Sequence, residues 1–444
     1  MDPSTFAAVL VGGIVGTLVA SVLALLPALH VYNVAGIFLL IIMKVSETVV
    51  LPEAAFVSFM MGLVVGYSMI NTIPSIFLGT PDEAALFITL PGQKYLMQGR
   101  GYEATLLTGA GGLGGIVFLA VAAPLLPILL PPFKQIIGPH LFWFLALMLA
   151  FMVMSEWPKG GDRGTPSQRF LDAWGSLFAG IATLVLSGLL GFILLYKPIV
   201  PPKYAFQNIM PAFVGLYAVP WLVTNIMSAT NVPKQIIPKT LDTTHALMVR
   251  GIAAGAGGGL IAAIFPIITG GMGGLIAGHA TAQRDERLFL ISQGTSKVVY
   301  YVGAFLLLFV PGLGLTRGGM AWMVQSFYTP ATFADYWMVI GSILISGGLS
   351  FLMLILFSKA MVKVVERVNH RYLSIVTSAI VVAVVYAITS WPGLLIMVVA
   401  TGIGMIPVFF HSRRMNCMGV LIIPVMLNMA GVGTTVAAFL GLIP

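Results

Sequence analysis

The stretch GGIVGTLVASVLALLPALHVYN, residues 12–33, joins an apolar run to a polar end across a proline. Its first part is apolar and long enough for a transmembrane helix, because about 20 such residues span the hydrocarbon core of a bilayer. Pro27 interrupts that helix, since proline lacks a backbone N–H and its ring clashes with the preceding turn. His30, Tyr32 and Asn33 follow directly, so the stretch predicts a broken helix with polar side chains at its break.

Apolar runs of this kind recur along all 444 residues, of which 59% are hydrophobic and 8% charged. This composition predicts an all-α polytopic membrane protein with about 10–12 transmembrane helices, some of them broken or re-entrant. The net charge of +8 fits Lys and Arg in short cytoplasmic loops. We therefore expect a multi-pass protein of the cytoplasmic membrane that contacts lipid and binds no nucleic acid.

Cysteine and histidine usage argues against a metal centre or a bound cofactor. Cys417 is the single cysteine, so no internal disulfide can form, and no His/Cys cluster has the spacing of metal ligands. Nor do the apolar runs carry an Asp-Asp, His-Glu-x-x-His or Ser-Lys arrangement suited to intramembrane catalysis. We expect neither a metal, nor a cofactor, nor an enzyme activity.

A second stretch, GIAAGAGGGLIAAIFPIITGGMGG, residues 251–274, repeats the pattern of the first. Setting Pro266 against Pro27 places Gly251 on Gly12, in each case 15 residues before the proline. The parallel predicts two inverted-repeat halves, residues 1–230 and 231–444, within one integral membrane domain. Chance likeness between glycine-rich membrane helices is the alternative. Paired breaks in two halves are the usual sequence sign of a transporter's binding site.

Helices broken inside the membrane expose backbone amides and the positive end of a helix dipole, which suit a carboxylate or a phosphate. Small polar residues near the two breaks could orient such an anion, although they also serve close helix packing, and a lysine could instead extend to the interface. The predicted substrate-binding residues are His30, Tyr32, Asn33, Asn71, Thr72, Thr269, Gly270, Gly271, Gly294, Thr295, Ser296 and Lys297.

Charged residues gather in NTIPSIFLGTPDEAALFITLPGQKYLMQGRGYEA, residues 71–104. Thr80 as N-cap and Pro81 at the first helical position predict a helix whose first turn holds Asp82 and Glu83. Both acids, together with His30, are candidates for binding a coupling ion, Na⁺ or H⁺. Arg100 is expected at the membrane surface, where it would hold this segment through Asp82, Glu83 or Glu103.

Two quoted segments, LGTPDEAALFITLPGQKYLMQGRGYEATLLTGAGG at residues 78–112 and LLPALHVYNVA at residues 25–35, resemble the large membrane subunit of tripartite tricarboxylate transporters, especially its archaeal branch. Looser matches are FPIITGG, residues 265–271, and SQGTSKVVYY, residues 292–301. The resemblance implies an inverted-repeat secondary transporter with a central anion site. It also implies partners, a small membrane subunit and an extracytoplasmic binding protein, and a homodimer is compatible with it.

This sequence departs from the family pattern at both breaks. Ala28 and Ile267 follow the two prolines where the family commonly has glycine, and Asp82 stands where bacterial members often have glycine. The expected function is an ion-gradient-driven secondary transporter of a small organic anion, resembling a di- or tricarboxylate, with alternating access around a mid-membrane site. The alternative is a polyprenyl-phosphate translocase, whose phosphate site would give a similar sequence pattern.

Overall fold

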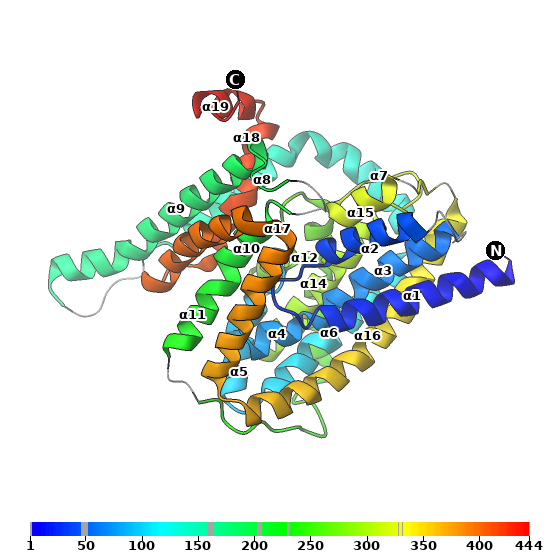
Figure 1. Ribbon diagram of the computed structural model, residues 1–444, viewed down its shortest axis with the longest axis horizontal. Coiled ribbons are helices and arrows are strands. Elements are labelled where there is room, and N and C mark those ends of the chain that lie inside the picture. Colours follow the sequence, from blue (N-terminus) through cyan, green and yellow to red (C-terminus); the bar gives the residue numbers. More distant parts are fainter. Residues whose placement is uncertain are drawn as a thin grey trace. The chain divides into compact units, whose positions relative to one another are not determined.

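The computed structural model describes residues 2–45, 52–158, 164–201, 207–228, 231–326, 328–330 and 332–443, and within these residues every regular element is a helix (Figure 1). Helices are expected because a chain in hydrocarbon must satisfy each backbone N–H and C=O internally. The α-helices are Pro3–Leu23 (α1), Val31–Val45 (α2), Glu53–Ile70 (α3), Thr72–Phe77 (α4), Leu86–Met97 (α5), Gly101–Ala122 (α6), Leu126–Ile137 (α7), Leu141–Met154 (α8), Pro166–Tyr196 (α9), Met210–Phe213 (α10), Val219–Met227 (α11), His245–Ile264 (α12), Gly270–Ala280 (α13), Glu286–Leu306 (α14), Gly318–Gln325 (α15), Phe333–Arg367 (α16), His370–Phe409 (α17), Gly419–Met429 (α18) and Gly433–Phe439 (α19).

The all-helical membrane class predicted from the sequence is confirmed. Nine helical segments among the described residues are long and apolar enough to cross a membrane, and a bent pair at Arg414–Phe439 would make ten. That count meets only the lower end of the predicted 10–12. Helix α14, with 21 residues, also has the length of a span, but Glu286, Arg287 and Lys297 make it more polar than the others.

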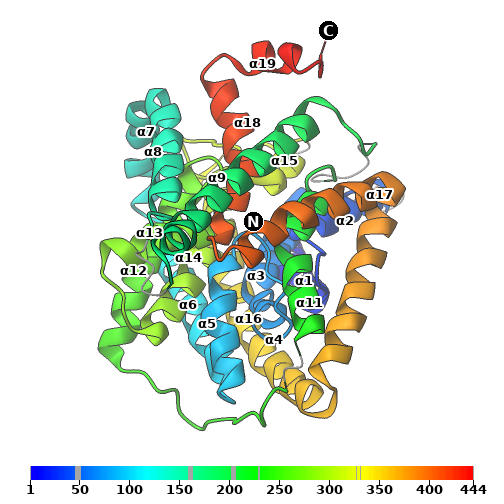
Figure 2. The same cartoon turned by 90° about the vertical axis from the view of Figure 1, so that its left-hand side faces the viewer.

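The chain forms two compact units, and each takes segments from separate parts of the sequence. The first unit contains Met1–Lys134 and Thr224–Ile380, and the second contains Gln135–Lys203, Gln207–Val223 and Val381–Pro444. In the first unit, α1 packs along α3 and α16, and α12 packs along α14. Figure 2 shows α5 beside α6 in the same unit. The predicted repeat halves, residues 1–230 and 231–444, stay a prediction.

Both predicted helix breaks are present. Helix α1 ends at Leu23 and α2 begins at Val31, while α12 ends at Ile264 and α13 begins at Gly270. Within each break, the residue after the proline has a left-handed backbone, with φ of 70° at Ala28 and at Ile267. Glycine adopts this conformation without strain, whereas a residue with a Cβ pays roughly 1–2 kcal/mol.

Glycine contacts attach α1 to α3 and α12 to α14, in each case the second helix further along the chain. A Cβ on Gly16 of α1 would lie 2.1 Å from the Phe59 carbonyl oxygen of α3. A Cβ on Gly255 of α12 would lie 2.3 Å from the Ser292 carbonyl oxygen of α14. These approaches are too close for any side chain, so the two helix pairs pack backbone against backbone, as small residues allow in membranes.

The segment after α3 corrects one prediction: Thr80 does not cap a new helix. Its backbone N–H and its hydroxyl both donate to the Pro74 carbonyl, at 3.3 and 3.2 Å. Gly79, with φ of 67°, turns the chain back so that these bonds form. Thr80 therefore completes the end of α4, and α5 begins later, at Leu86. Asp82 and Glu83 consequently lie in the loop before α5 and not in its first turn.

An ion-pair network joins the start of α6 to α14 and to the loop before α12. Arg100 donates to the Glu103 carboxylate at 2.7 and 2.8 Å, which confirms one of its three predicted partners, and it also contacts Asp242 at 3.2 Å. Arg287 contacts Asp242 at 2.9 Å and Asp285 at 2.7 Å. Hydrogen bonds from Arg287 hold the pKa of Asp285 below its ordinary value. The network fixes this end of the first unit.

Removing the backbone strain at the first break should stabilise the protein. Ala28→Gly is expected to raise the free energy of unfolding by roughly 0.5–1 kcal/mol, because glycine adopts the left-handed conformation freely. Ala7→Gly, in the regular part of α1, should instead lower it by roughly 0.5–1 kcal/mol. Thermal unfolding in detergent measures both, and a loss of stability in Ala28→Gly would contradict the strained backbone.

Filling the close backbone contacts should be costly. Gly16→Ala and Gly255→Ala are each expected to lower the free energy of unfolding by about 1–3 kcal/mol, because a methyl group must push two helices apart. Gly257→Ala is the matched control, since a Cβ at that position of α12 meets no atom within 4 Å. The contacts would be disproved if the three variants unfolded at the same temperature.

Candidate functional site

Asp82 accepts hydrogen bonds on both oxygens of its carboxylate. Oδ1 accepts from the backbone N–H groups of Ala84 and Ala85, at 3.1 and 2.7 Å. These bonds hold the loop before α5 in a tight turn, as an aspartate cap does. Oδ2 accepts from Tyr67 of α3 at 3.0 Å and from Tyr301 of α14 at 2.8 Å. Asp82 thus ties its own loop to two helices of the first unit.

His30 occupies the last position of the first break and has a defined tautomer. Its Nδ1 accepts a hydrogen bond from the Tyr32 N–H at 3.2 Å, so Nδ1 carries a lone pair and no proton. Nε2 is then the protonated nitrogen of a neutral imidazole. It lies 3.3 Å from Glu83 Oε1 and 3.3 Å from the Tyr301 hydroxyl. His30 therefore caps α2 with one nitrogen and donates towards Glu83 with the other.

Lys297 of α14 is buried, with 1% of its surface exposed. Its ammonium donates hydrogen bonds to the Asn71 side-chain oxygen and to the Thr72 hydroxyl. Asn71 in turn donates from Nδ2 to Asp82 Oδ2 at 2.5 Å. A continuous chain of polar contacts therefore connects Lys297, Asn71 and Asp82. We name the group of Asp82, Glu83, His30 and Lys297 the charge cluster.

The second break supplies the remaining wall of this site. Thr269 caps α13, since its hydroxyl accepts from the Met272 N–H, and it donates to the Glu83 backbone carbonyl at 3.1 Å. A Cβ on Gly270 would lie 2.7 Å from the Lys297 Cα. The start of α13 thus lies against both α14 and the loop that holds Glu83. Residues from both breaks, His30 and Thr269, contact Glu83.

The predicted site residues divide into two groups. The first group surrounds the charge cluster: His30, Tyr32, Asn71, Thr72, Thr269, Gly270, Gly271, Lys297, Asp82 and Glu83. The second group makes packing contacts. Gly294 packs on the Thr108 backbone, and the Thr295 hydroxyl donates to the Gly111 carbonyl at 2.7 Å, so both face α6. Ser296 donates to the Gly270 carbonyl at 2.6 Å and joins α14 to α13.

Asn33 of α2 is fully buried, and neither atom of its side-chain amide has a hydrogen-bond partner among the described residues. Gln293 of α14 shares both properties. A buried polar group without a partner costs about 1–3 kcal/mol. These two amides are therefore an energetic cost to the fold that the described protein contacts do not offset.

The sequence reasoning missed Tyr67, Tyr301 and Gln293. Tyr301 lies four residues after Lys297, so both fall on one face of a helix, and this spacing was the available signal. Tyr67 stands in an apolar run, where an aromatic residue usually serves packing. No local pattern distinguishes it from a core residue.

Ligand atoms of His30, Asp82 and Glu83 lie within 4.8 Å of one another, close enough to surround a cation. A transition metal would need a lone pair on the histidine nitrogen that faces it. In this arrangement Nε2 carries a proton instead, because Nδ1 already accepts from a backbone N–H. The histidine nitrogen that faces the two acids therefore does not fit a transition metal.

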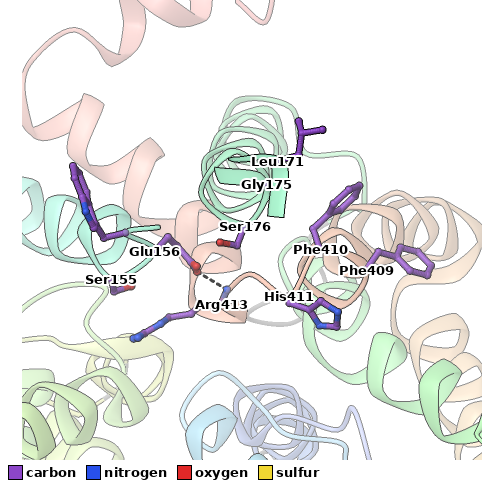
Figure 3. Close-up of a pocket in the computed structure, with 10 residues that line it drawn as sticks. Ser155, Glu156, Leu171, Gly175, Ser176, Phe409, Phe410, His411 and Arg413 are labelled. Carbon is purple, nitrogen blue, oxygen red and sulfur yellow. Dashed lines mark hydrogen bonds between the residues drawn. The ribbon is translucent and has the colours of Figure 1, made fainter. Parts of the chain in front are cut away.

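A separate cavity of about 430 Å³ lies in the second unit (Figure 3). Glu156 Oε1 accepts hydrogen bonds there from the Arg413 backbone N–H and from Asn416 Nδ2, the latter at 3.0 Å. Ser176, Phe410 and other residues complete its wall. None of the predicted site residues lines this cavity. The charge cluster is therefore the candidate functional site.

Comparisons with known proteins agree with the resemblance seen in the sequence. The family model described as "Tripartite tricarboxylate transporter TctA family" matches residues 6–419, and the chain belongs to this family. A Methanocaldococcus jannaschii protein named "Uncharacterized protein MJ1079" is 26% identical over 426 residues, which cover 93% of this chain and 97% of the relative. No solved structure matches the chain.

The buried charges of the site should be energetically coupled. Lys297→Met is expected to lower the free energy of unfolding by about 3–5 kcal/mol, because it leaves the Asp82 carboxylate without its cation. Adding Asp82→Asn to that variant should restore part of the loss, so the two changes are not additive. Lys94→Met with Glu286→Gln is the control, since this exposed pair should couple by less than about 1 kcal/mol. Additive effects at Lys297 and Asp82 would contradict the polar connection through Asn71.

Proposed function

We propose that this member of the family is an ion-gradient-driven secondary transporter of a small organic anion, of the di- or tricarboxylate kind. The family itself is one of tricarboxylate transporters, so membrane transport is its shared property and an enzymatic role is not proposed. Alternating access would take place around the charge cluster. The cytoplasmic membrane is the proposed location, with a small membrane subunit and an extracytoplasmic binding protein as partners, as the tripartite family name suggests.

One observation carries the proposal: residues from both helix breaks meet at one buried residue, Glu83. His30 ends the first break and Thr269 ends the second, and they contact the side chain and the backbone carbonyl of Glu83, respectively. Broken helices facing each other at membrane depth are the arrangement in which transporters hold ions and anionic substrates. The matching left-handed residues Ala28 and Ile267 further support two related halves, as the sequence predicted.

Charge balance supports ion coupling at this site. Among the groups in direct contact, Asp82 and Glu83 carry two negative charges when ionised, whereas Lys297 carries one positive charge and His30 is neutral. A buried charge without compensation costs several kcal/mol, so a cation or a proton is expected to bind with the substrate. Na⁺ and H⁺ are both candidates.

The direct test is a ligand-stabilisation screen on the purified chain in detergent. Citrate, succinate and inorganic phosphate would be added at several pH values, with and without sodium, and the unfolding temperature measured. Stabilisation by the carboxylates that grows at lower pH, or in sodium, is the expected result. Stabilisation by a prenyl phosphate and by none of the carboxylates would overturn the proposal and favour the lipid-carrier alternative.

Asn33 allows stability to be separated from binding. Asn33→Leu is expected to raise the free energy of unfolding of the ligand-free protein by about 1–2 kcal/mol, because the unpartnered amide is removed. The same change should weaken carboxylate binding at least about tenfold, since the amide N–H can no longer donate a hydrogen bond to the charged carboxylate. Ser21→Ala is the control, because Ser21 of α1 is also fully buried with an unpartnered hydroxyl. It should stabilise the protein without changing affinity. Unchanged affinity in Asn33→Leu would remove Asn33 from the site.

A further inference from the structure

A short segment at the start of α15 connects the two helix breaks. Gly318 has φ of 80°, and a Cβ there would lie 2.6 Å from the Tyr32 hydroxyl oxygen, next to the first break. A Cβ on Gly319 would lie 3.2 Å from the Tyr32 ring. The preceding residue, Arg317, directs its side chain to the second break. One tripeptide therefore touches both breaks.

The Arg317 guanidinium binds the carbonyl oxygens that the second break leaves open. Nη2 donates to Phe265 at 2.6 Å and to Ala262 at 3.4 Å, and Nε donates to Ala263 at 3.2 Å. These carbonyls belong to the end of α12, where helix geometry provides no partner and the dipole is negative. The contacts use three of the five hydrogen-bond donors of the guanidinium.

The rest of this guanidinium has no acidic partner among the residues described. Arg100 and Arg287, by contrast, each contact two carboxylates. The two N–H groups of Arg317 Nη1 make no protein hydrogen bond within the described part of the chain. Arg317 is partly buried, so this positive charge is weakly screened by solvent.

Lys297 is not free to meet an anionic substrate, although the sequence suggested that role. Its ammonium is occupied by Asn71 and Thr72 and balances Asp82 through Asn71. An anion at the breaks needs another cation. Arg317 lies near the same site, because the next residue, Gly318, approaches the Tyr32 hydroxyl. The Tyr32 ring in turn packs on His30, with ring centroids 4.6 Å apart, and His30 contacts Glu83.

We propose that Arg317 binds a carboxylate group of the transported anion through Nη1, while its other edge holds the end of α12. The inference rests on the proposed function and assigns the anion-recognising residue within that site. Arginine suits the role because its planar fork can bind carbonyls on one edge and a carboxylate on the other, which a lysine ammonium cannot do with the same geometry. The anion then lies at the second break, across the site from the charge cluster.

The experiment is calorimetric titration of citrate and succinate into the purified full chain and its variants. Arg317→Gln should raise the Kd for both anions at least about tenfold, which corresponds to a loss of about 1.4 kcal/mol in binding free energy. Arg317→Lys should raise the Kd by a smaller factor, because the positive charge remains although the planar guanidinium is lost. Arg287→Gln is the matched control, since that guanidinium is already paired with Asp285 and Asp242. Its affinity for both anions should stay at the wild-type value.

A purely structural role for Arg317 gives a different result. If the residue only caps α12, Arg317→Gln lowers the unfolding temperature of the ligand-free protein and leaves the citrate Kd unchanged, which would overturn the inference alone. Should Arg317→Gln not fold, Arg317→Lys provides the same comparison, because its cation still faces the α12 carbonyls. Wild-type protein that binds neither citrate nor succinate would overturn the proposed function and this assignment together.

Discussion

Unpaired backbone groups at the helix breaks are the constraint on which this structure depends. Every helix that stops inside hydrocarbon leaves N–H and C=O groups that water cannot satisfy. The first unit resolves this with side chains: His30 accepts from the Tyr32 N–H at the start of α2, and Thr269 does the same for Met272 in α13. Arg317 donates to the carbonyls at the end of α12. The side chains that hydrogen-bond to the unpaired backbone groups at the breaks are therefore also the side chains that surround the site.

Burial gives the charge cluster its chemical character. Lys297 and Glu83 are almost fully removed from the surface, where an uncompensated charge is strongly unfavourable. Tyr67 and Asn71 stabilise the Asp82 carboxylate by donating to it. The single Tyr301 hydroxyl proton lies within reach of both acids, 2.8 Å from Asp82 and 3.1 Å from Glu83, and Glu83 otherwise contacts His30. Of the two acids, Glu83 is thus less completely paired, and it is the one that both breaks touch. A change in its protonation would act directly on His30 at the start of α2.

The sequence predicted the features that depend on local chemistry. Long apolar runs indicated the helices, and Pro27 and Pro266 indicated the breaks, because proline acts on its own backbone. The polar residues beside those prolines include His30 and Thr269, which both contact Glu83. Thr80 was misplaced because its Thr-Pro pattern fits an N-cap, whereas Gly79 turns the chain so that Thr80 bonds back to Pro74. Tyr67 and Arg317 were missed because their roles come from segments that meet only in the folded chain.

The two sides of the site suggest how an anion gradient and an ion gradient can be linked. Without substrate, the positive charge of Arg317 and the negative charge of Glu83 lie on either side of Tyr32 and His30 and partly offset each other. A substrate carboxylate on Arg317 would cancel that offset, and Glu83 would then bind a proton or cation more favourably. By thermodynamic reciprocity, a proton or cation at Glu83 would raise the affinity for the anion by the same factor. Coupling would then require only that both ligands share one buried electrostatic field, with no direct contact between them.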